Sequence, residues 1–190
     1  ALADGRNLSF KELVEEASIG KKNFCYSINE NGSIGIEKIE SPRITKKSTQ
    51  VIKIVLDNGE EIVCTPDHKF MLRDSNYKEA GKLTIEDSLM PLYKKLSKIG
   101  GKIRIDGYEM ILDPNNNWVF THMLADQFNL QNNIYAKDQG DARHHIDFNK
   151  LNNNPENIIR LTKEEHLILH TEHLSKTLHR EDVKQKCKEI

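Results

Sequence analysis

Four of the chain's eight histidines have types and spacings that suit metal binding and proton transfer. His144 and His145 are adjacent, and His166 and His170 lie four residues apart. Residues four apart on a helix project from one face, about 6 Å from each other. A third imidazole from a facing strand would complete a divalent-metal site with positions left open for a substrate oxygen. His144 is the natural third ligand.

The adjacent pair offers two functions at once. If His144 and His145 lie in a strand, their side chains point to opposite faces. One imidazole can then bind the metal while the other accepts a proton, and a pKa of about 6.5 suits the deprotonation of water near neutral pH. Taken singly, His170, His173 and His179 are interpreted as surface residues of an amphipathic helix.

A His pair, an Asn-rich loop, the pattern Asn153-x-Pro155-x-Asn157 and a helical His follow one another in this order. This combination resembles the HNH (ββα-metal) nucleases, above all homing endonucleases. The sequence WVFTHMLADQF (residues 118–128) is similar to the segment that precedes the module in phage-type members. The resemblance therefore extends over about residues 105–171.

The resemblance implies a role for each residue. His144 becomes the first metal ligand, His145 the general base that activates water, and His166 the ligand from the helix. Asn157 becomes the middle Asn, whose side chain ties the loop, and His170 is a candidate extra ligand as in His-rich members. The implied cofactor is one divalent metal ion, with Mg²⁺ expected in the cell, while an imidazole-rich ligand set also accepts Zn²⁺, Ni²⁺ or Mn²⁺.

A second group of candidate residues is the sequence TPDH, with Thr65, Asp67 and His68 at the end of an expected strand. With its surroundings (residues 57–93) it resembles the N-terminal splicing region of inteins (Hint fold), especially inteins inserted in DNA gyrase B. In that family Thr and His polarise the peptide bond before the intein. The resemblance implies the same for Thr65 and His68, with Asp67 between them, as donors that stabilise a tetrahedral intermediate.

Residues 1–93 read as short strands. Residues 51–56 and 61–64 alternate apolar and polar on both sides of Asn58-Gly59, the strongest local hairpin signal. The same device recurs around Asn31-Gly32, and a turn is expected at Asp4-Gly5.

Two helices interrupt these strands. The first begins after Ser9, with Glu12 at the capping-box position, and the second begins at Thr84, with Asp87 in the same relation, and ends near Pro91.

The pattern changes after Gly100-Gly101. A hairpin joins residues 103–113 to 117–124, helices are expected over residues 121–129 and 161–178, and the His pair ends a strand. The fold class is therefore α+β with two domains: a mostly-β, partial Hint domain (residues 1–94) and a ββα-metal HNH endonuclease domain (residues 104–190). A basic linker (residues 95–103) joins them.

The basic stretch is the expected contact to double-stranded DNA, and it adds positive charge locally to a chain of net charge −1. Its residues are Lys94, Lys95, Lys98, Lys102 and Arg104. Asn115, Asn116 and Asn117 are further candidates for contacts with phosphates and base edges.

Composition narrows the context of the protein. No apolar run approaches the roughly 18 residues of a membrane span, and no export signal is visible, so we expect a cytoplasmic protein. Cys25, Cys64 and Cys187 lack the spacing of a disulfide framework or a thiolate zinc site, and we expect free thiols.

These patterns favour an intein-encoded homing endonuclease that hydrolyses DNA at an intein-less site. By itself the chain should not splice, because the nucleophile and the C-terminal block of the intein family are not matched. Its expected partners are N- and C-terminal intein segments and a flanking host protein, gyrase B. Two alternatives remain: a split-intein fragment acting in trans-splicing with a decayed HNH insert, and a DNA-binding regulator with an inert ββα fold.

Overall fold

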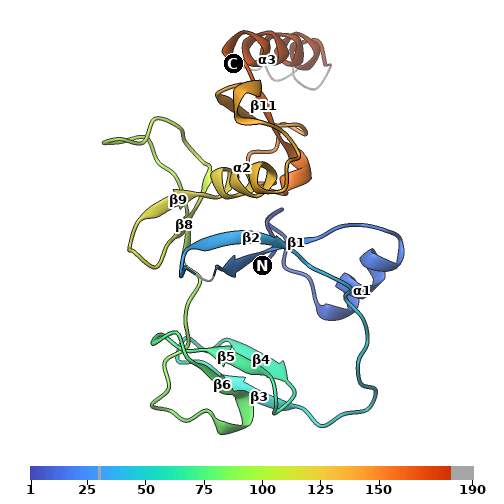
Figure 1. Ribbon diagram of the computed structural model, residues 1–190, viewed down its shortest axis with the longest axis vertical. Coiled ribbons are helices and arrows are strands. Elements are labelled where there is room, and N and C mark those ends of the chain that lie inside the picture. Colours follow the sequence, from blue (N-terminus) through green and yellow to red (C-terminus); the bar gives the residue numbers. More distant parts are fainter. Residues whose placement is uncertain (30, 181–190) are drawn as a thin grey trace. The chain divides into compact units, whose positions relative to one another are not determined.

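The computed structural model describes residues 1–29 and 31–180 and shows a mixed α+β protein with several small sheets (Figure 1). The backbone divides into two compact units: the first combines residues 1–41 with residues 94–180, and the second is residues 42–93. None of the helices in these described residues is long and apolar enough to cross a membrane.

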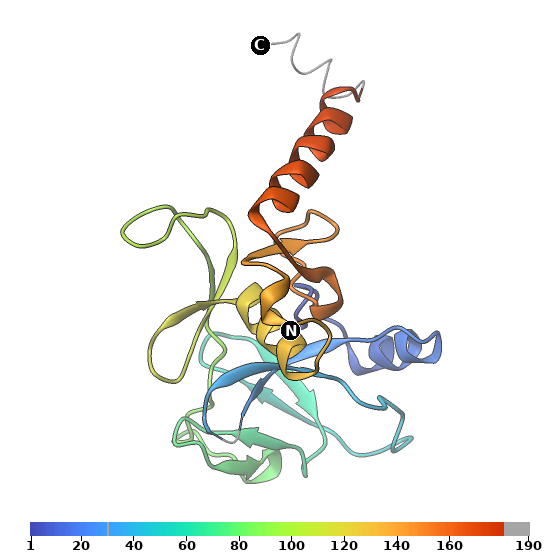
Figure 2. The same cartoon turned by 45° about the horizontal axis from the view of Figure 1, so that its top comes forward.

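The first unit contains most of the regular structure. Its elements are α1 (Phe10–Ser18), β1 (Phe24–Ile28), β2 (Ile34–Lys38), β7 (Lys94–Leu96), β8 (Glu109–Leu112), β9 (Trp118–Phe120), α2 (Thr121–Gln131), η2 (Lys137–Gln139), β10 (Ala142–His145), η3 (Pro155–Asn157), β11 (Ile158–Leu161) and α3 (Lys163–Leu178). β1 pairs with β2, β10 with β11, and β7, β8 and β9 form a three-stranded antiparallel sheet. The far end of α3 extends away from β10 and β11 (Figure 2).

The second unit consists of two hairpins and one short 3₁₀ turn. Its elements are β3 (Ile52–Val55), β4 (Glu61–Cys64), β5 (Lys69–Met71), β6 (Tyr77–Glu79) and η1 (Ala80–Lys82). β3 pairs with β4 and β5 with β6, both antiparallel.

The hairpins predicted from Asn-Gly pairs are confirmed. β3 and β4 flank Asn58-Gly59, β1 and β2 flank Asn31-Gly32, and both glycines adopt the positive φ that such turns require, +83° and +77°. The Asp4-Gly5 turn also forms, with the Gly5 N–H donating to the Leu2 carbonyl. The free thiols expected at Cys25 and Cys64 are present, and Cys187 lies outside the described residues.

One of the two helices predicted in residues 1–93 is correct. Ser9 and Glu12 form the expected capping box at the start of α1. The helix predicted from Thr84 is wrong: Thr84 and Asp87 close a single turn, and the chain then pairs in a strand-like way with residues 71–72. Lys78 also binds the Asp87 carboxylate. Tertiary pairing therefore overrides a local helix signal.

The predicted linker is wrong over its first residues. Lys94–Leu96 form β7, which pairs with β8, and Gly100 and Ile103 bridge each other to close a loop. Buried Ser97 ties this loop, since its hydroxyl donates to the Ile105 carbonyl and accepts from the Tyr108 N–H.

One boundary between the compact units falls at residues 93 and 94, close to the predicted one, but residues 1–41 do not group with residues 42–93 as predicted. Residues 1–41 share one hydrophobic core with the C-terminal half, because the apolar face of the β1–β2 hairpin packs on α2, where the Phe24 and Phe128 rings meet edge to face at 5.4 Å. The buried members of this core are Ala3, Phe24, Ile34, Ile36, Ile111, Leu124, Ala125 and Ile158. A hairpin of the predicted splicing region thus belongs to the same unit as the histidines.

A buried ionic network fixes α2 to the β10–β11 hairpin. The Arg160 guanidinium donates twice to the Asp126 carboxylate at 2.7 Å, and Arg143 and Tyr135 donate to the same group. Burial alone would raise the pKa of Asp126, but these donors outweigh it and lower the pKa. Arg160 also donates to the Lys137 and Gly140 carbonyls, so the network closes the loop before β10.

Replacing Asp126 by Ala should lower the free energy of unfolding by about 3–5 kcal/mol, because it leaves the Arg160 charge buried without its partner. Urea unfolding measures this loss. Glu15→Ala, which removes an exposed ion pair with Lys11 on α1, is the matched control and should cost less than about 1 kcal/mol. Equal losses in the two variants would contradict a role for the buried network.

Candidate active site

β10 and its partner β11 place the adjacent histidines. His144 pairs with Ile159 and His145 with Ile158, so the two imidazoles point to opposite faces, and both are buried. The chain then turns into α3 at Thr162, whose hydroxyl accepts from the Glu165 N–H while the Glu165 carboxylate accepts from the Thr162 N–H. This capping box fixes where the helix starts, and hence where its histidines lie.

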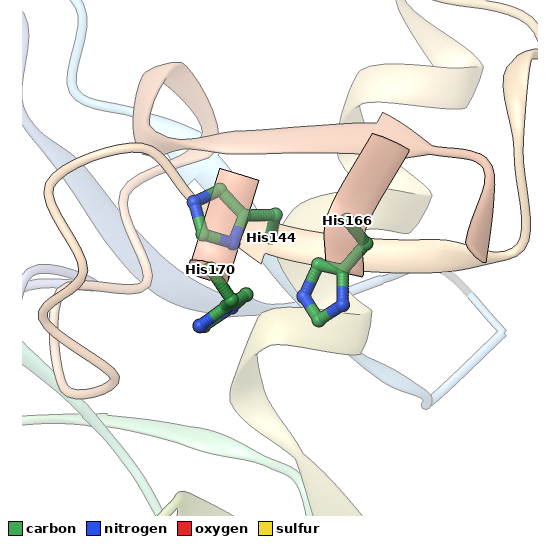
Figure 3. Close-up of side chains that lie close together, drawn as sticks. All are labelled: His144, His166 and His170. Atoms are coloured by element: carbon green, nitrogen blue, oxygen red, sulfur yellow. The ribbon is translucent and has the colours of Figure 1, made fainter. Parts of the chain in front are cut away.

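On one face of β10, the structure brings three imidazoles together. His144 from the strand and His166 and His170 from the helix lie side by side (Figure 3), with one nitrogen of each within 4.8 Å of the others. His144 is 3% exposed, and its Nε2 is buried with no hydrogen-bond partner among the described residues. A buried nitrogen without a partner costs free energy unless something binds it.

Burial and the neighbouring rings of His170 and His166 lower the pKa of His144 to about 4. Burial and His170 lower the pKa of His166 as well. Both imidazoles are therefore neutral near pH 7, which is the form that binds a metal ion. The donor set, the spacing and the charge state thus fit one divalent cation.

Phe148 covers this group from the side. Its ring meets His144 edge to face at 4.7 Å and stacks on exposed His173 at 3.7 Å. Phe148 adopts a φ of +59°, which is rare for a bulky residue and stores local strain. The ring therefore contacts His144, His170 and His173 at once.

His145 occupies the other face of β10. Its Nε2 lies 3.2 Å from Asn153 Oδ1, and the Asn153 amide nitrogen donates to the Leu151 carbonyl, which fixes the orientation of the amide. With the amide in that orientation, Nε2 carries the proton and Nδ1 keeps its lone pair. Burial lowers the pKa of His145, opposed by the Asn153 contact and the Asp147 charge.

Asn157 ties the loop between β10 and η3. Its amide nitrogen donates to Asp147 Oδ1 and the Asn152 carbonyl, both at 2.8 Å, and its oxygen accepts from the Asp147 N–H. These contacts hold backbone and side chains of the loop. The structure therefore gives Asn157 a positioning role.

Two residues of this site were not singled out from the sequence. Asn153, fully buried, was noted only as part of the Asn pattern. His122, near the start of α2, is 8% exposed, packs edge-on against His145 at 5.8 Å and against Tyr108 at 5.4 Å, and has a buried Nδ1 without a partner among the described residues. The sequence predicted only that His122 lies on a helix. Its neighbours His145 and Tyr108 come from other segments of the chain.

The predicted splicing residues lie in the second unit. Thr65, Asp67 and His68 form the turn between β4 and β5, closed by the His68 N–H donating to the Thr65 carbonyl at 3.1 Å. The pKa of the exposed Asp67 is lowered mainly by a hydrogen bond from the Thr65 side chain, and further by a hydrogen bond from Lys46 and its charge. The His68 ring packs edge to face against Phe70. The turn thus presents exposed imidazole and carboxylate groups next to a half-buried hydroxyl.

The predicted DNA-binding residues are not equivalent. Lys94 is bound to Glu109, so its charge is neutralised, and Lys95 lies 3.8 Å above the Trp118 ring. Lys98, Lys102 and Arg104 are exposed in the loop between β7 and β8. This loop carries the more available positive charge.

Burial, and then the charge of His145, lower the pKa of His122 from 6.5 to about 4. Because the folded-state pKa is the lower one, His122 stabilises the fold fully above about pH 6.5 and loses up to about 3 kcal/mol as the pH falls towards 4. In His122→Phe this contribution should vanish, so thermal unfolding at pH 7 and pH 4.5 should differ less than in the wild type. An unchanged pH dependence would contradict this assignment.

Comparison with known proteins identifies the family. Residues 1–189 match the intein splicing domain family. The chain is 57% identical over 192 residues to DNA gyrase B from Synechocystis sp., in a match that includes 100% of this chain and 18% of the gyrase protein. The chain thus spans less than a fifth of the length of this curated relative. It belongs to the intein splicing domain family.

Proposed function

We propose that this intein chain also carries a metal-dependent DNA endonuclease of the HNH (ββα-metal) type, which cuts an intein-less insertion site. The observation that carries the proposal is the arrangement around β10: three imidazoles on one face with nitrogens close enough to share one ion, and buried His145 on the other face. A purely structural cluster would leave the Nε2 of His144 without a partner, at a cost of about 1–3 kcal/mol.

The residues that would hold the ion are His144, His166 and His170. Three imidazoles leave room for further ligands, as catalytic sites require, and accept Zn²⁺, Ni²⁺ or Mn²⁺, whereas Mg²⁺ would need oxygen ligands from water and the phosphate in the remaining positions. When bound, the cation supplies Lewis-acid stabilisation of negative charge on the scissile phosphate.

His145 is the proposed general base. Its Nδ1 accepts a proton from water, and the water oxygen forms a bond to phosphorus while the bond from phosphorus to the 3′ oxygen breaks. The departing oxygen takes a proton from solvent, which leaves a 5′-phosphate and a 3′-hydroxyl. Asn153 keeps the proton of His145 on Nε2, so that the lone pair stays on the nitrogen that acts as the base.

DNA contacts are proposed for the exposed loop between β7 and β8, through Lys98, Lys102 and Arg104. Lys95, whose ammonium lies over the Trp118 ring, and the turn that contains Asn116 are further candidates. Since the net charge of the chain is −1, affinity depends on these local charges and should fall as salt rises.

A second function is favoured by the family match, namely a part in protein splicing. We propose that Thr65 and His68 donate hydrogen bonds to the scissile peptide carbonyl, with Asp67 holding the turn. The partners are N- and C-terminal intein segments, and the host is proposed to be gyrase B because of the identity to that protein.

The nuclease proposal predicts that His145→Ala lowers the rate of DNA cleavage by about 10²- to 10⁴-fold and leaves DNA binding intact, because only proton transfer is lost. The substrate is a duplex spanning an uninterrupted gyrase B insertion site, with Mg²⁺ or Mn²⁺ added, and gel electrophoresis measures cleavage. A chelator should abolish cutting.

His179→Ala, at the exposed end of α3, is the matched control and should cut like the wild type. Thermal unfolding shows whether each variant is folded. Full cleavage by folded His145→Ala would overturn the role of the base, and a wild type that binds DNA but never cuts it would favour an inert ββα domain.

The splicing proposal predicts a separation of the two functions. With N- and C-terminal intein segments supplied, His68→Ala should reduce the rate at which ligated flanks form by about 10²- to 10³-fold, since one oxyanion donor is lost, and should leave DNA cleavage unchanged. His145→Ala should show the reverse pattern. Electrophoresis and mass spectrometry of the ligated product measure splicing, and undiminished ligation by His68→Ala would exclude this role.

A further inference from the structure

The general base depends on a residue that is itself held from outside the β10–α3 region. Asn153 is fully buried, and its side chain bridges His145 and the Leu151 carbonyl. Its backbone N–H donates to the carbonyl of Ala3 at 2.9 Å. The amide that orients His145 is therefore attached to the third residue of the chain.

Ala3 is in turn rigidly placed. It is fully buried, and its N–H donates to the Phe24 carbonyl of β1 at 2.8 Å. The N-terminal turn (residues 2–6) closes around it, with the Leu2 N–H donating to the Arg6 carbonyl and the Gly5 N–H to Leu2. A bridge between Leu2 and Cys25 adds a second link to β1.

The N-terminal turn also touches the Asn-rich loop directly. Gly5 adopts a φ of +85°, and a Cβ added there would lie 3.4 Å from the Leu151 carbonyl oxygen. Beside it, the Lys22 ammonium binds the Glu156 carboxylate. The N-terminal turn and Lys22, two residues before β1, thus both meet the loop that runs from Asn149 to Asn157.

We propose that the N-terminal turn is a positioning element of the nuclease centre, acting through Ala3 and Asn153 on His145. The inference rests on the proposed nuclease function. The turn fixes the position of the Asn-rich loop relative to β10. It thereby fixes which nitrogen of His145 carries the proton and how its ring is oriented. The nuclease centre is therefore completed by residues 1–41 and is not confined to residues 104–190.

The test compares two glycines in the full chain. Gly5→Ala and Gly20→Ala both place a side chain at a positive φ, +85° and +81°, so the backbone cost is similar. Only the Cβ at residue 5 meets the Asn-rich loop, since a Cβ at residue 20 has no atom within 4 Å. Gly20→Ala is thus a matched control for strain without contact.

Gly5→Ala should lower kcat for DNA cleavage by up to about tenfold with KM unchanged, because strain at the positive φ of residue 5, next to a Cβ contact of 3.4 Å with the Asn-rich loop, displaces the base slightly. Gly20→Ala should keep the wild-type kcat. In ¹⁵N-imidazole NMR spectra without metal or DNA, the Nε2–H signal of His145 should shift in Gly5→Ala alone.

Unchanged kcat and unchanged His145 signals in folded Gly5→Ala would overturn the inference. If the wild type does not cut DNA, the proposed nuclease function fails, and the His145 signals still decide the positioning role. If Gly5→Ala does not fold, Asp4→Asn replaces it: losing the bond from Arg6 Nε loosens the same turn, and a smaller shift and loss of kcat are expected. Wild-type values in that variant would equally refute the role of the turn.

Discussion

Successive side chains of a β-strand point to opposite faces, and this constraint decides what the histidines can do. His144 and His145 are neighbours in β10, so one faces α3 and the other faces Tyr108, His122 and Asn153. Two identical side chains thereby acquire different partners. A one-residue slip of β10 against β11 would exchange them, so the register with Ile158 and Ile159 decides which histidine has which partners.

Several contacts protect that register. The Asp126 network holds both strands of the hairpin, through Arg143 on β10 and Arg160 on β11. Asn129, which lies on α2 like Asp126, donates to the Pro155 and Ile158 carbonyls. α2 thus anchors the β10–β11 hairpin. The β1–β2 hairpin packs on the same helix. The core that stabilises the fold therefore also aligns the two faces of the site.

Local signals predicted a large part of this structure. Asn-Gly turns, the capping box at Ser9 and the spacing of His166 and His170 all depend on residues close in sequence, and these features are present. The segment at Thr84 carried the same signal and failed, because pairing with residues 71–72 was not visible locally.

The features missed from the sequence are tertiary. The Asn31-Gly32 turn predicts the β1–β2 hairpin but not what covers it, so the packing of Phe24 and Ile36 on α2 was not foreseen. His122 and Asn153 acquire meaning only from rings and carbonyls that lie far away in the sequence.

The central claim is that His144, His166 and His170 bind one ion while His145 stays free. A ¹⁵N-imidazole NMR titration of the full chain with Zn²⁺ tests it most directly. One equivalent should shift the signals of His144, His166 and His170 together, while the Nε2–H of His145 keeps its hydrogen bond. Binding through His145, or a titration that leaves any of the three imidazoles unchanged, would contradict it.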